Sequence, residues 1–371
     1  MRITGIADLP LHGGHAPSWL VRRMKHLASA IVRVIVDDYG EREVLRRLGD
    51  PFWFQSFGCV LGFDWHSSGL TTVVTGALRE ALSLEEHGVA LAGGKGRMSR
   101  TVHEQLSAAQ LSGGVAEQLY RASRLTAKVD NAVLQDGYSI YHHVIAYTSS
   151  GEWAVIQQGM NDANGYARRY HWLWEDVASF VVEPHSGLVG DKVEMRVINM
   201  TSKGSEEARR VSLDIVRESP QKLIRLINIA SSRQETLTAF TSSQDEQIKL
   251  PAHLSMPRRI DWDTVRRAYD MQPTNYEELV DVRGMGPATI RALALVASII
   301  YGAEVDWRDP VKYSFAHGGK DGVPYPVERR RMDKVIGFLR EAVEASEIDA
   351  REKKDALRRL LSLERRLYGR G

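Results

Sequence analysis

Polar residues that could bind a metal or move a proton gather in the first half of the chain. Six of them are Asp130, Asp136, His142, His143, Gln157 and Gln158. Imidazoles and carboxylates are ligands of Mg²⁺ or Mn²⁺, and such a centre can activate water at a phosphodiester. Polar residues that face one another on otherwise apolar strands cost free energy unless they pair or serve a site. These six residues are therefore predicted to be catalytic, with divalent Mg or Mn as the cofactor.

Two further pairs of ligand-type residues precede this cluster. His12 and His15 flank a Gly-Gly turn, and Asp64 and His66 stand just before a predicted helix. We interpret these four side chains as candidate metal ligands. No spacing in the chain matches a strict metal signature such as HExxH. A structural role is therefore the alternative for each of these histidines.

A second motif lies in YEELVDVRGMGPATIRALALVASIIYGAEVD, in the second half of the chain. A short helix is predicted before the RGMG turn, and a second helix begins with Pro287, a residue favoured at the first helical position. Gly284 and Gly286 leave the backbone of the turn unobstructed. Because unpaired N–H groups at a helix N-terminus bind phosphate oxygens, the turn is predicted to hold a phosphate. An ordinary helical corner is the alternative.

The same residues resemble the helix-hairpin-helix motif of DNA-repair proteins, a clamp that holds the DNA backbone without reading its sequence. The resemblance implies DNA binding over residues 276–301, through Arg283, Gly284, Gly286, Ala288, Thr289 and Arg291.

Base-excision glycosylases of this superfamily carry a catalytic Asp after the hairpin, and Asp306 stands at that position here. The nucleophilic Lys of the glycosylase/lyase branch is replaced by Ala288, which argues against a lyase. A capping residue for the turn before WRDP is the alternative role for Asp306.

Phrases along nearly the whole chain resemble an archaeal and bacterial protein family of unknown function. They include GIADLPLHGGHAPSWL, FGCVLGFDWHSSGLTT, ARRYHWL and AHGGKDGVPYPV. The resemblance implies a prokaryotic protein built in two parts that ends in the helix-hairpin-helix region. It transfers no catalytic residue.

The predicted helices and strands that position these groups indicate an α+β fold. An N-terminal mixed α/β domain with a β-hairpin is expected over residues 1–200, and a mainly helical helix-hairpin-helix domain over residues 201–371. Helical spacing appears at 28–48, where Gly40 could break the helix, and again at 69–88 and 114–134.

The spacing of apolar residues changes to the two-residue period of strands in YSIYHHVIAY and EWAVIQQGM, which lie on either side of a TSSG turn. If Tyr147 pairs with Glu152 in this hairpin, His142 lies opposite Gln157. VASFVVEP and KVEMRVINM are further predicted strands. The polar segment SSRQETLTAFTSSQDEQIKLPAHLSMPRR is interpreted as a linker or a long surface loop.

Composition limits the class of protein. The chain has 371 residues, of which 43% are hydrophobic and 26% charged, so it is globular and long enough for two domains. A net charge of +2 is too small to indicate nucleic-acid binding by itself. Cys59, the single cysteine, excludes an internal disulfide and a cysteine-based zinc site. Neither a signal peptide nor a membrane span is expected, so the predicted location is cytoplasmic.

These observations predict a DNA-processing repair protein. The leading interpretation is a structure-specific, metal-dependent endonuclease, a hydrolase that grips the DNA backbone with its helix-hairpin-helix. One alternative is a monofunctional base-excision DNA glycosylase that uses Asp306, and another is a non-catalytic DNA-binding repair accessory protein. Branched or damaged duplex DNA is the expected partner, and a second copy of the chain or another repair protein is a further candidate.

Overall fold

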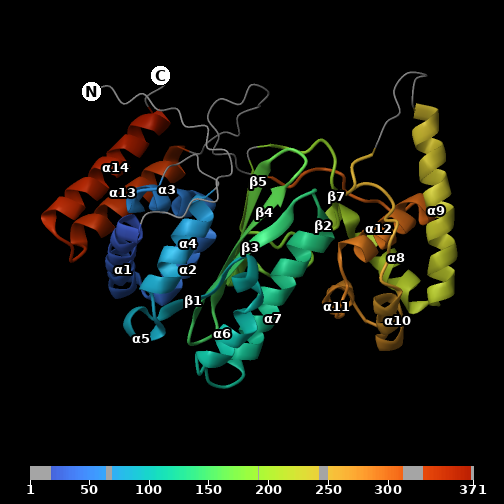
Figure 1. Ribbon diagram of the computed structural model, residues 1–371, viewed down its shortest axis with the longest axis horizontal. Coiled ribbons are helices and arrows are strands. Elements are labelled where there is room, and N and C mark those ends of the chain that lie inside the picture. Colours follow the sequence, from blue (N-terminus) through green and yellow to red (C-terminus); the bar gives the residue numbers. More distant parts are fainter. Residues whose placement is uncertain (1–17, 64–68, 191, 242–249, 312–328, 369–371) are drawn as a thin grey trace.

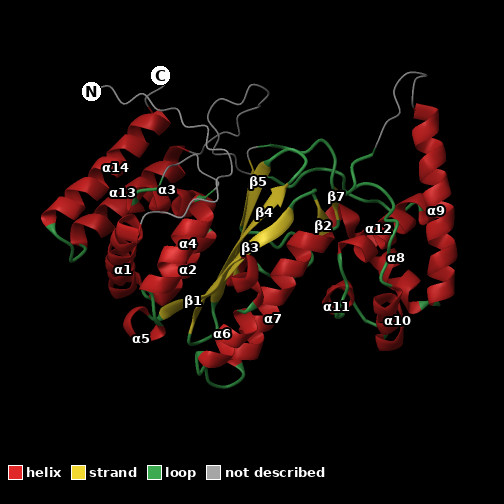
Figure 2. Cartoon of the chain, viewed as in Figure 1, coloured by secondary structure: helices red, strands yellow, loops and turns green. Residues whose placement is uncertain are grey.

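A five-stranded antiparallel sheet in the order β1-β3-β4-β5-β6 lies at the centre of the fold (Figure 2). The computed structural model describes residues 18–63, 69–190, 192–241, 250–311 and 329–368. The strands of the sheet are β1 (Val89–Lys95), β3 (Ser139–Thr148), β4 (Trp153–Asn161), β5 (Tyr166–Leu173) and β6 (Gly187–Gly190). A second ladder pairs β2 (Leu134–Gln135) with β7 (Ile198–Asn199). With helices around these strands, the predicted α+β class is confirmed.

One face of the sheet is covered by helices from both ends of the described chain (Figure 1). They are α1 (Ser18–Tyr39), α2 (Glu41–Gly49), α3 (Pro51–Leu61), α4 (Leu70–Ala81), α5 (Leu84–His87), α13 (Arg329–Ala345) and α14 (Ala350–Tyr368). Alternate strand residues such as Val144, Ala146 and Ile156 join this core, as the two-residue period of a strand requires. Helices α13 and α14 therefore pack with the N-terminal helices, although they belong to the last part of the chain.

The opposite face of the sheet packs against α6 (Val102–Ala108) and α7 (Val115–Lys128). Five further helices pack beyond α7: α8 (Glu206–Arg217), α9 (Pro220–Thr241), α10 (Trp262–Met271), α11 (Tyr276–Asp281) and α12 (Pro287–Tyr301). Ile145, Val155 and Trp172 point from the sheet into this second core, which continues without a break into the helices around α12. None of the helices within the described ranges has the length and apolar character that a membrane crossing needs.

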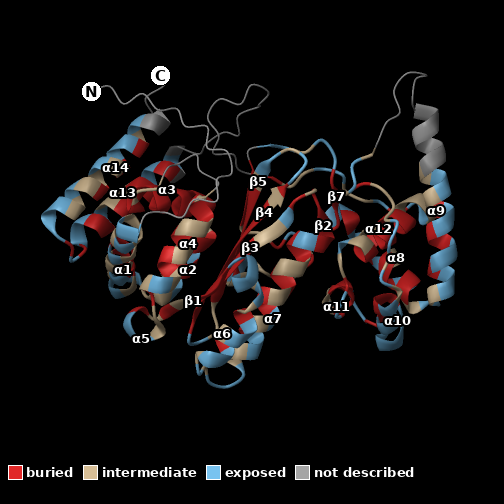
Figure 3. Cartoon of the chain, viewed as in Figure 1, coloured by how far each residue is buried: buried red, intermediate tan, exposed pale blue. Residues whose placement is uncertain are grey.

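The helix boundaries follow from local chemistry. Gly40, at φ +81°, separates α1 from α2, so the predicted break of the 28–48 helix is confirmed. Helix α3 begins with Pro51 at its first position, and the side chain of Asp50 accepts hydrogen bonds from the backbone N–H groups of Phe52 and Trp53. Every residue of α3 is buried, because α13 and α14 cover the side that α1, α2 and α4 leave open (Figure 3).

Three predicted segments differ from the structure. Residues 177–184 form no strand, and the segment 192–200 contributes only the two residues of β7. Helix α9 extends to Thr241, into the segment interpreted as a linker. The strand β1 was not predicted from VALAGGK, because alanine and glycine have weak β propensity. It nevertheless pairs with β3 over its whole length.

The register of the β3–β4 hairpin is shifted by one residue from the predicted one. Tyr147 pairs with Trp153, so His143 lies opposite Gln157. The pairing of Tyr147 with Glu152 was therefore wrong, because the connection holds one residue more than the expected turn. Since side chains alternate between the two faces, His143 and Gln157 share the face covered by α7, whereas His142 points to the other face, toward α4.

Candidate functional site

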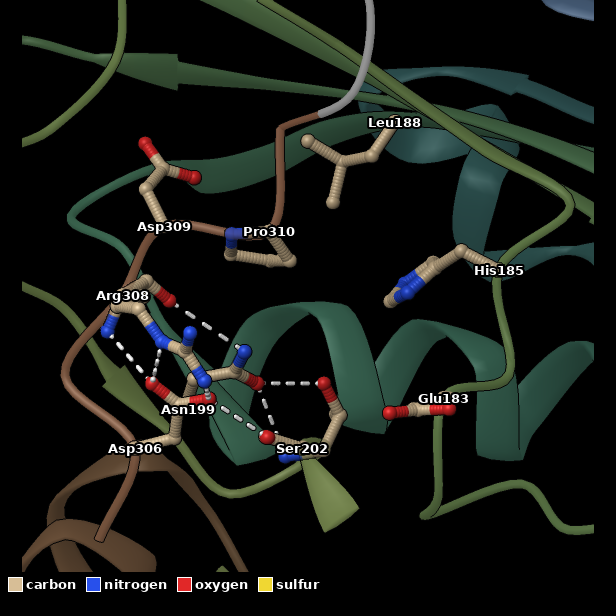
Figure 4. Close-up of a pocket in the computed structure, with 10 residues that line it drawn as sticks. Glu183, His185, Leu188, Asn199, Ser202, Asp306, Arg308, Asp309 and Pro310 are labelled. Carbon is tan, nitrogen blue, oxygen red and sulfur yellow. Dashed lines mark hydrogen bonds and ion pairs between the residues drawn. The ribbon is translucent and has the colours of Figure 1, made fainter. Parts of the chain in front are cut away.

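A cavity of about 310 Å³ opens where β7 and residues 306–310 meet the segment between β5 and β6 (Figure 4). It is lined by Glu183, His185, Leu188, Asn199, Thr201, Ser202, Asp306, Arg308, Asp309 and Pro310. Seven of the ten lining residues carry an ionisable or hydroxyl group, and Leu188 and Pro310 are the apolar ones. Two buried polar networks reach the cavity from the interior of the protein.

The first network is centred on Asp130. This residue lies in the single π-helical turn Val129–Val133 that follows α7, and it is completely buried. One carboxylate oxygen lies 2.5 Å from Nε2 of His185. The other oxygen accepts hydrogen bonds from the indole N–H of Trp172 at 2.8 Å and from the side-chain amide of Gln157 at 2.5 Å. Burial holds the pKa of Asp130 above its ordinary value, although these three partners oppose the rise.

The network continues away from the cavity to Ser123. Because the amide nitrogen of Gln157 donates to Asp130, its oxygen must accept, and Nδ1 of His143 donates to it at 2.8 Å. Nε2 of His143 is then an acceptor for the Ser123 hydroxyl, at 2.6 Å. Burial lowers the pKa of His143 to about 4, so the neutral ring that this pattern needs is present at neutral pH. Ser123, His143 and Gln157 thereby fix the position of the Asp130 carboxylate.

The second network is centred on Arg168, whose side chain has no exposed surface. It donates to Asp136 at 2.8 Å and to Asp309 at 2.6 Å. Asp136 also accepts the Tyr170 hydroxyl at 2.7 Å, and the guanidinium lies 4.3 Å from the centre of the Tyr138 ring. Through Asp309 this network holds the segment that forms one wall of the cavity.

Asp306 also lines the cavity, and both of its carboxylate oxygens accept hydrogen bonds from neighbouring residues. It accepts hydrogen bonds from the Ser202 hydroxyl at 2.7 Å and from both the backbone and the side chain of Arg308. Burial raises the pKa of Asp306, but these hydrogen bonds outweigh it, so the pKa lies below its ordinary value and the group is an anion at neutral pH. Its bond to the backbone N–H of Arg308 is the capping role expected as the alternative for this residue.

A strained backbone conformation marks the cavity at Glu183. Its φ of +44° lies in the left-handed region, which residues other than glycine rarely adopt. Its N–H donates to the carbonyl of Thr201 at 2.8 Å, and this bond holds it there. Such strain persists only where the surrounding structure enforces it, and it is common at functional sites.

The predicted catalytic residues divide among three places. Asp130, His143 and Gln157 meet in the first network, and Asp136 lies in the second. His142 and Gln158 lie on the other side of the sheet, where Nε2 of His142 shares a hydrogen bond with the Thr75 hydroxyl at 2.9 Å. Burial lowers the pKa of His142 to about 3. The six residues therefore do not form one centre, and all of them are buried.

The candidate metal ligands His12, His15, Asp64 and His66 lie outside the described residues. Within the described ranges, no three His, Cys, Asp or Glu side chains come close enough together to hold a metal ion.

Helices α11 and α12 form a hairpin around the predicted turn. Gly284 is exposed at φ +90°, and a Cβ at this position would collide with the Thr264 side chain. Gly286 precedes α12 in an extended conformation, and no side chain caps the helix there. Met285, between the two glycines, is buried and anchors the turn. The first N–H groups of α12 are thus left without a side-chain acceptor at an exposed turn.

The hairpin is fastened to α7 and β2. Nζ of Lys128 donates to three consecutive carbonyl groups at the end of α11, those of Val280, Asp281 and Val282, at 2.7–3.1 Å. The side-chain amide of Gln135 donates to the carbonyl of Pro287 at 2.9 Å and accepts from Arg291 at 2.9 Å. Arg291 is therefore turned toward the interior.

The remaining predicted contact residues differ in exposure. Arg283 is exposed, Ala288 is partly exposed and Thr289 is buried.

The hairpin and the cavity are joined by the β2–β7 ladder. Leu134 of β2 pairs with Asn199 of β7, and Asn199 also bridges Asp306 on its other side. Because neighbouring strands lie about 4.8 Å apart, roughly 10 Å separates the backbone of β2 from that of Asp306. The ladder therefore connects β2, which contacts the start of α12 through Gln135, to one wall of the cavity.

The sequence matches the family described as "Protein of unknown function (DUF763)" over residues 5–327. The chain belongs to the DUF763 family. No curated protein and no solved structure matches it. The matched residues of this DUF763 chain include both the cavity and the α11–α12 hairpin, whereas α13 and α14 follow them.

Sequence reasoning on the DUF763 chain counted His185 among the polar residues of the first half but did not predict it to be catalytic or a metal ligand. It lies in an irregular segment without a periodic pattern, and it pairs with an Asp that is 55 residues away. The signal that was present is the PHSG tetrapeptide beside a buried strand, in which a polar aromatic ring stands between two turn-forming residues.

Proposed function

We propose that this chain binds the phosphate backbone of duplex DNA through the α11–α12 hairpin, as a helix-hairpin-helix protein of DNA repair. The observation that carries the proposal is the exposed Gly284 turn, which leads into the uncapped N-terminus of α12. The proposal keeps the predicted partner, branched or damaged duplex DNA.

The backbone amides support this role. The first N–H groups of a helix point along its axis and carry the positive end of the helix dipole, so they favour a phosphate oxygen. The neighbouring α10 and α11 are capped by the side chains of Asp261 and Asn275, respectively. Helix α12 instead begins at Gly286, where no side chain stands between its amides and a ligand.

Exposed arginines support it as well. Arg283 in the turn, and Arg258 and Arg259 in the segment before α10, are exposed, and no described residue gives any of them a carboxylate partner within 4 Å. Guanidinium groups without an internal partner can neutralise phosphates, and contacts of this kind position a protein on DNA without reading its sequence.

The described residues give less support to a metal-dependent cleavage reaction than to DNA binding. The six predicted catalytic residues are all buried, and the four candidate metal ligands lie outside the described residues. Backbone binding is therefore the function that the geometry supports best, and metal-dependent cleavage is one arm of the test.

Binding is tested by fluorescence anisotropy with labelled duplex, forked and single-stranded DNA at several salt concentrations. We expect the logarithm of the affinity to fall linearly with the logarithm of the salt concentration, by about 0.9 for each neutralised phosphate. Arg283→Ala should reduce that slope by about 1. The matched control is Arg351→Ala, an exposed arginine of α14 on the other side of the sheet, which should leave the slope unchanged.

Equal losses in the two arginine variants, or an affinity that does not depend on salt, would contradict the proposal. The same mixtures are incubated with Mg²⁺, with Mn²⁺ and with EDTA. Metal-dependent nicking of forked DNA would support the endonuclease, and binding without a product would leave the accessory protein.

A further inference from the structure

The two nitrogens of the His185 ring have different surroundings. Nε2 faces the buried carboxylate of Asp130 at 2.5 Å. Nδ1 has no hydrogen-bond partner among the described residues, and the ring points into the cavity (Figure 4). A carboxylate only accepts hydrogen bonds, so Asp130 places the proton of the neutral ring on Nε2. The lone pair of Nδ1 is then directed at the space where a ligand would lie.

The Asp130 carboxylate is fixed by hydrogen bonds, as a group that orients the His185 ring must be. Trp172 and Gln157 fix the carboxylate oxygen that His185 does not use, and His143 fixes Gln157. A carboxylate that orients an imidazole and stabilises its protonated form is the arrangement by which enzymes make histidine a general base.

The charges of the cavity restrict the bond that could be broken there. Arg308 is the guanidinium of the lining, and it is already paired with Asp306. The Asp306 side chain is 10% exposed, whereas the Arg308 side chain is 88% exposed. The carboxylate therefore forms part of the cavity wall, and the guanidinium lies mainly in solvent. Glu183 also lines the cavity and pairs with Lys203 at 2.8 Å, so an added phosphate would meet carboxylates and no uncommitted cation among the lining residues. A neutral group that becomes positively charged in its transition state would be stabilised.

We propose that His185, oriented by Asp130, is the general base for hydrolysis of the N-glycosidic bond of a nucleoside that is turned out of duplex DNA into this cavity. The inference rests on the proposed function, because the hairpin must hold the duplex from which the nucleoside is turned out. Turning a nucleotide out of the stack is the way in which enzymes reach a base within a duplex.

The reaction balances without a metal or a second substrate. Water adds to C1′ of the deoxyribose, and its proton passes to Nδ1 of His185. The C1′–N bond breaks, and its electron pair leaves with the base, which takes a proton from solvent or from His185. The products are the free base and an abasic sugar with a hydroxyl at C1′. The carboxylates of the wall stabilise the positive charge that develops on the sugar ring.

The test uses the full chain, duplexes that contain uracil, hypoxanthine, 8-oxoguanine or 3-methyladenine, and EDTA throughout. Released base is measured by chromatography, and abasic sites are measured by alkaline cleavage. We expect base release from at least one duplex, and His185→Gln should slow it about 10²- to 10⁴-fold, the usual contribution of a general base. The affinity for the same duplex should not change. His103→Gln, at an exposed histidine of α6, is the matched control and should keep the full rate.

Asp130→Asn provides a second readout. Without the carboxylate the protonated ring loses its counter-charge, so the acidic limb of the pH–rate profile should move to lower pH while the rate falls. A purely structural role would lower the rate without moving the profile.

Duplex binding without base release from any substrate would overturn this inference and leave the proposed function standing. Phosphodiester cleavage in place of base release would overturn it as well. Absence of duplex binding would overturn the proposed function itself, and the anisotropy measurement reports that result separately.

Discussion

Replacing Arg168 with methionine tests whether charge holds the second buried network. Arg168 lies 2.8 Å from Asp136 and 2.6 Å from Asp309, and none of the three side chains has exposed surface. Methionine fills the space of the aliphatic stem but leaves two buried carboxyl groups without a cation. Because removal of one partner of a buried ion pair costs about 3–5 kcal/mol, we expect a loss of this size in urea unfolding at pH 7.

The loss should become smaller in acid. Burial raises the pKa of Asp136, and the attraction of Arg168 lowers it, so the variant should have a still higher pKa at this group. A folded-state pKa above the unfolded value means that the folded state binds more protons. Stability is then fully present at low pH and is lost as the pH rises through the folded-state pKa. The two proteins should differ more at pH 7.5 than at pH 5.

Two comparisons make the result decisive. Arg266→Met removes an arginine whose ion pair with Asp263 is largely exposed, and it should leave the urea midpoint nearly unchanged. Adding Asp136→Asn to Arg168→Met should recover part of the loss, because it removes one of the two uncompensated carboxyl groups. The reasoning is refuted if Arg168→Met costs less than about 1 kcal/mol, the range of surface pairs, or costs the same at both pH values.

Three further predictions follow from the contacts. Lys128→Met should lower the free energy of unfolding by about 1–3 kcal/mol, because three carbonyl groups lose their donor. Burial lowers the pKa of Lys128 to about 8, so the unmodified protein should gain stability as the pH rises from 8 toward 10, and the variant should lack this slope in urea titrations. The rings of His142 and His143 should stay neutral in NMR spectra down to about pH 5, and a titration near neutral pH would contradict their burial. Gly284→Ala should cost about 1–2 kcal/mol in thermal unfolding and weaken DNA binding, because alanine is strained at a positive φ; unchanged stability would show that the turn is conformationally free.

Much of the fold could be predicted because its signals are local. The β3–β4 hairpin, the break at Gly40 and the helix that begins at Pro287 each depend on residues close together in the sequence. The strand β1 could not be predicted in the same way, since its alanines and glycines are strand residues only through pairing with β3.

The candidate site could be predicted in part. Polar residues on apolar strands indicate that they will pair with one another, and His143 with Gln157 does so. Residue type does not show whether such a pair meets solvent. The cavity depends on residues separated by more than a hundred positions, such as His185 and Asp306, and no local pattern places them together.

The burial of α3 has a consequence for how the protein is made. Residues 51–61 read PFWFQSFGCVL, an aromatic and uncharged helix, and the helices that close over it begin roughly 270 residues later. At a synthesis rate of about 5–20 residues per second, roughly a quarter of a minute to a minute passes between synthesis of this segment and synthesis of α13. An exposed apolar segment of this kind is an aggregation hazard. The nascent chain therefore needs protection from aggregation until its last helices emerge. A chain truncated before α13 would leave α3 partly exposed and prone to aggregation, even if its sheet had formed.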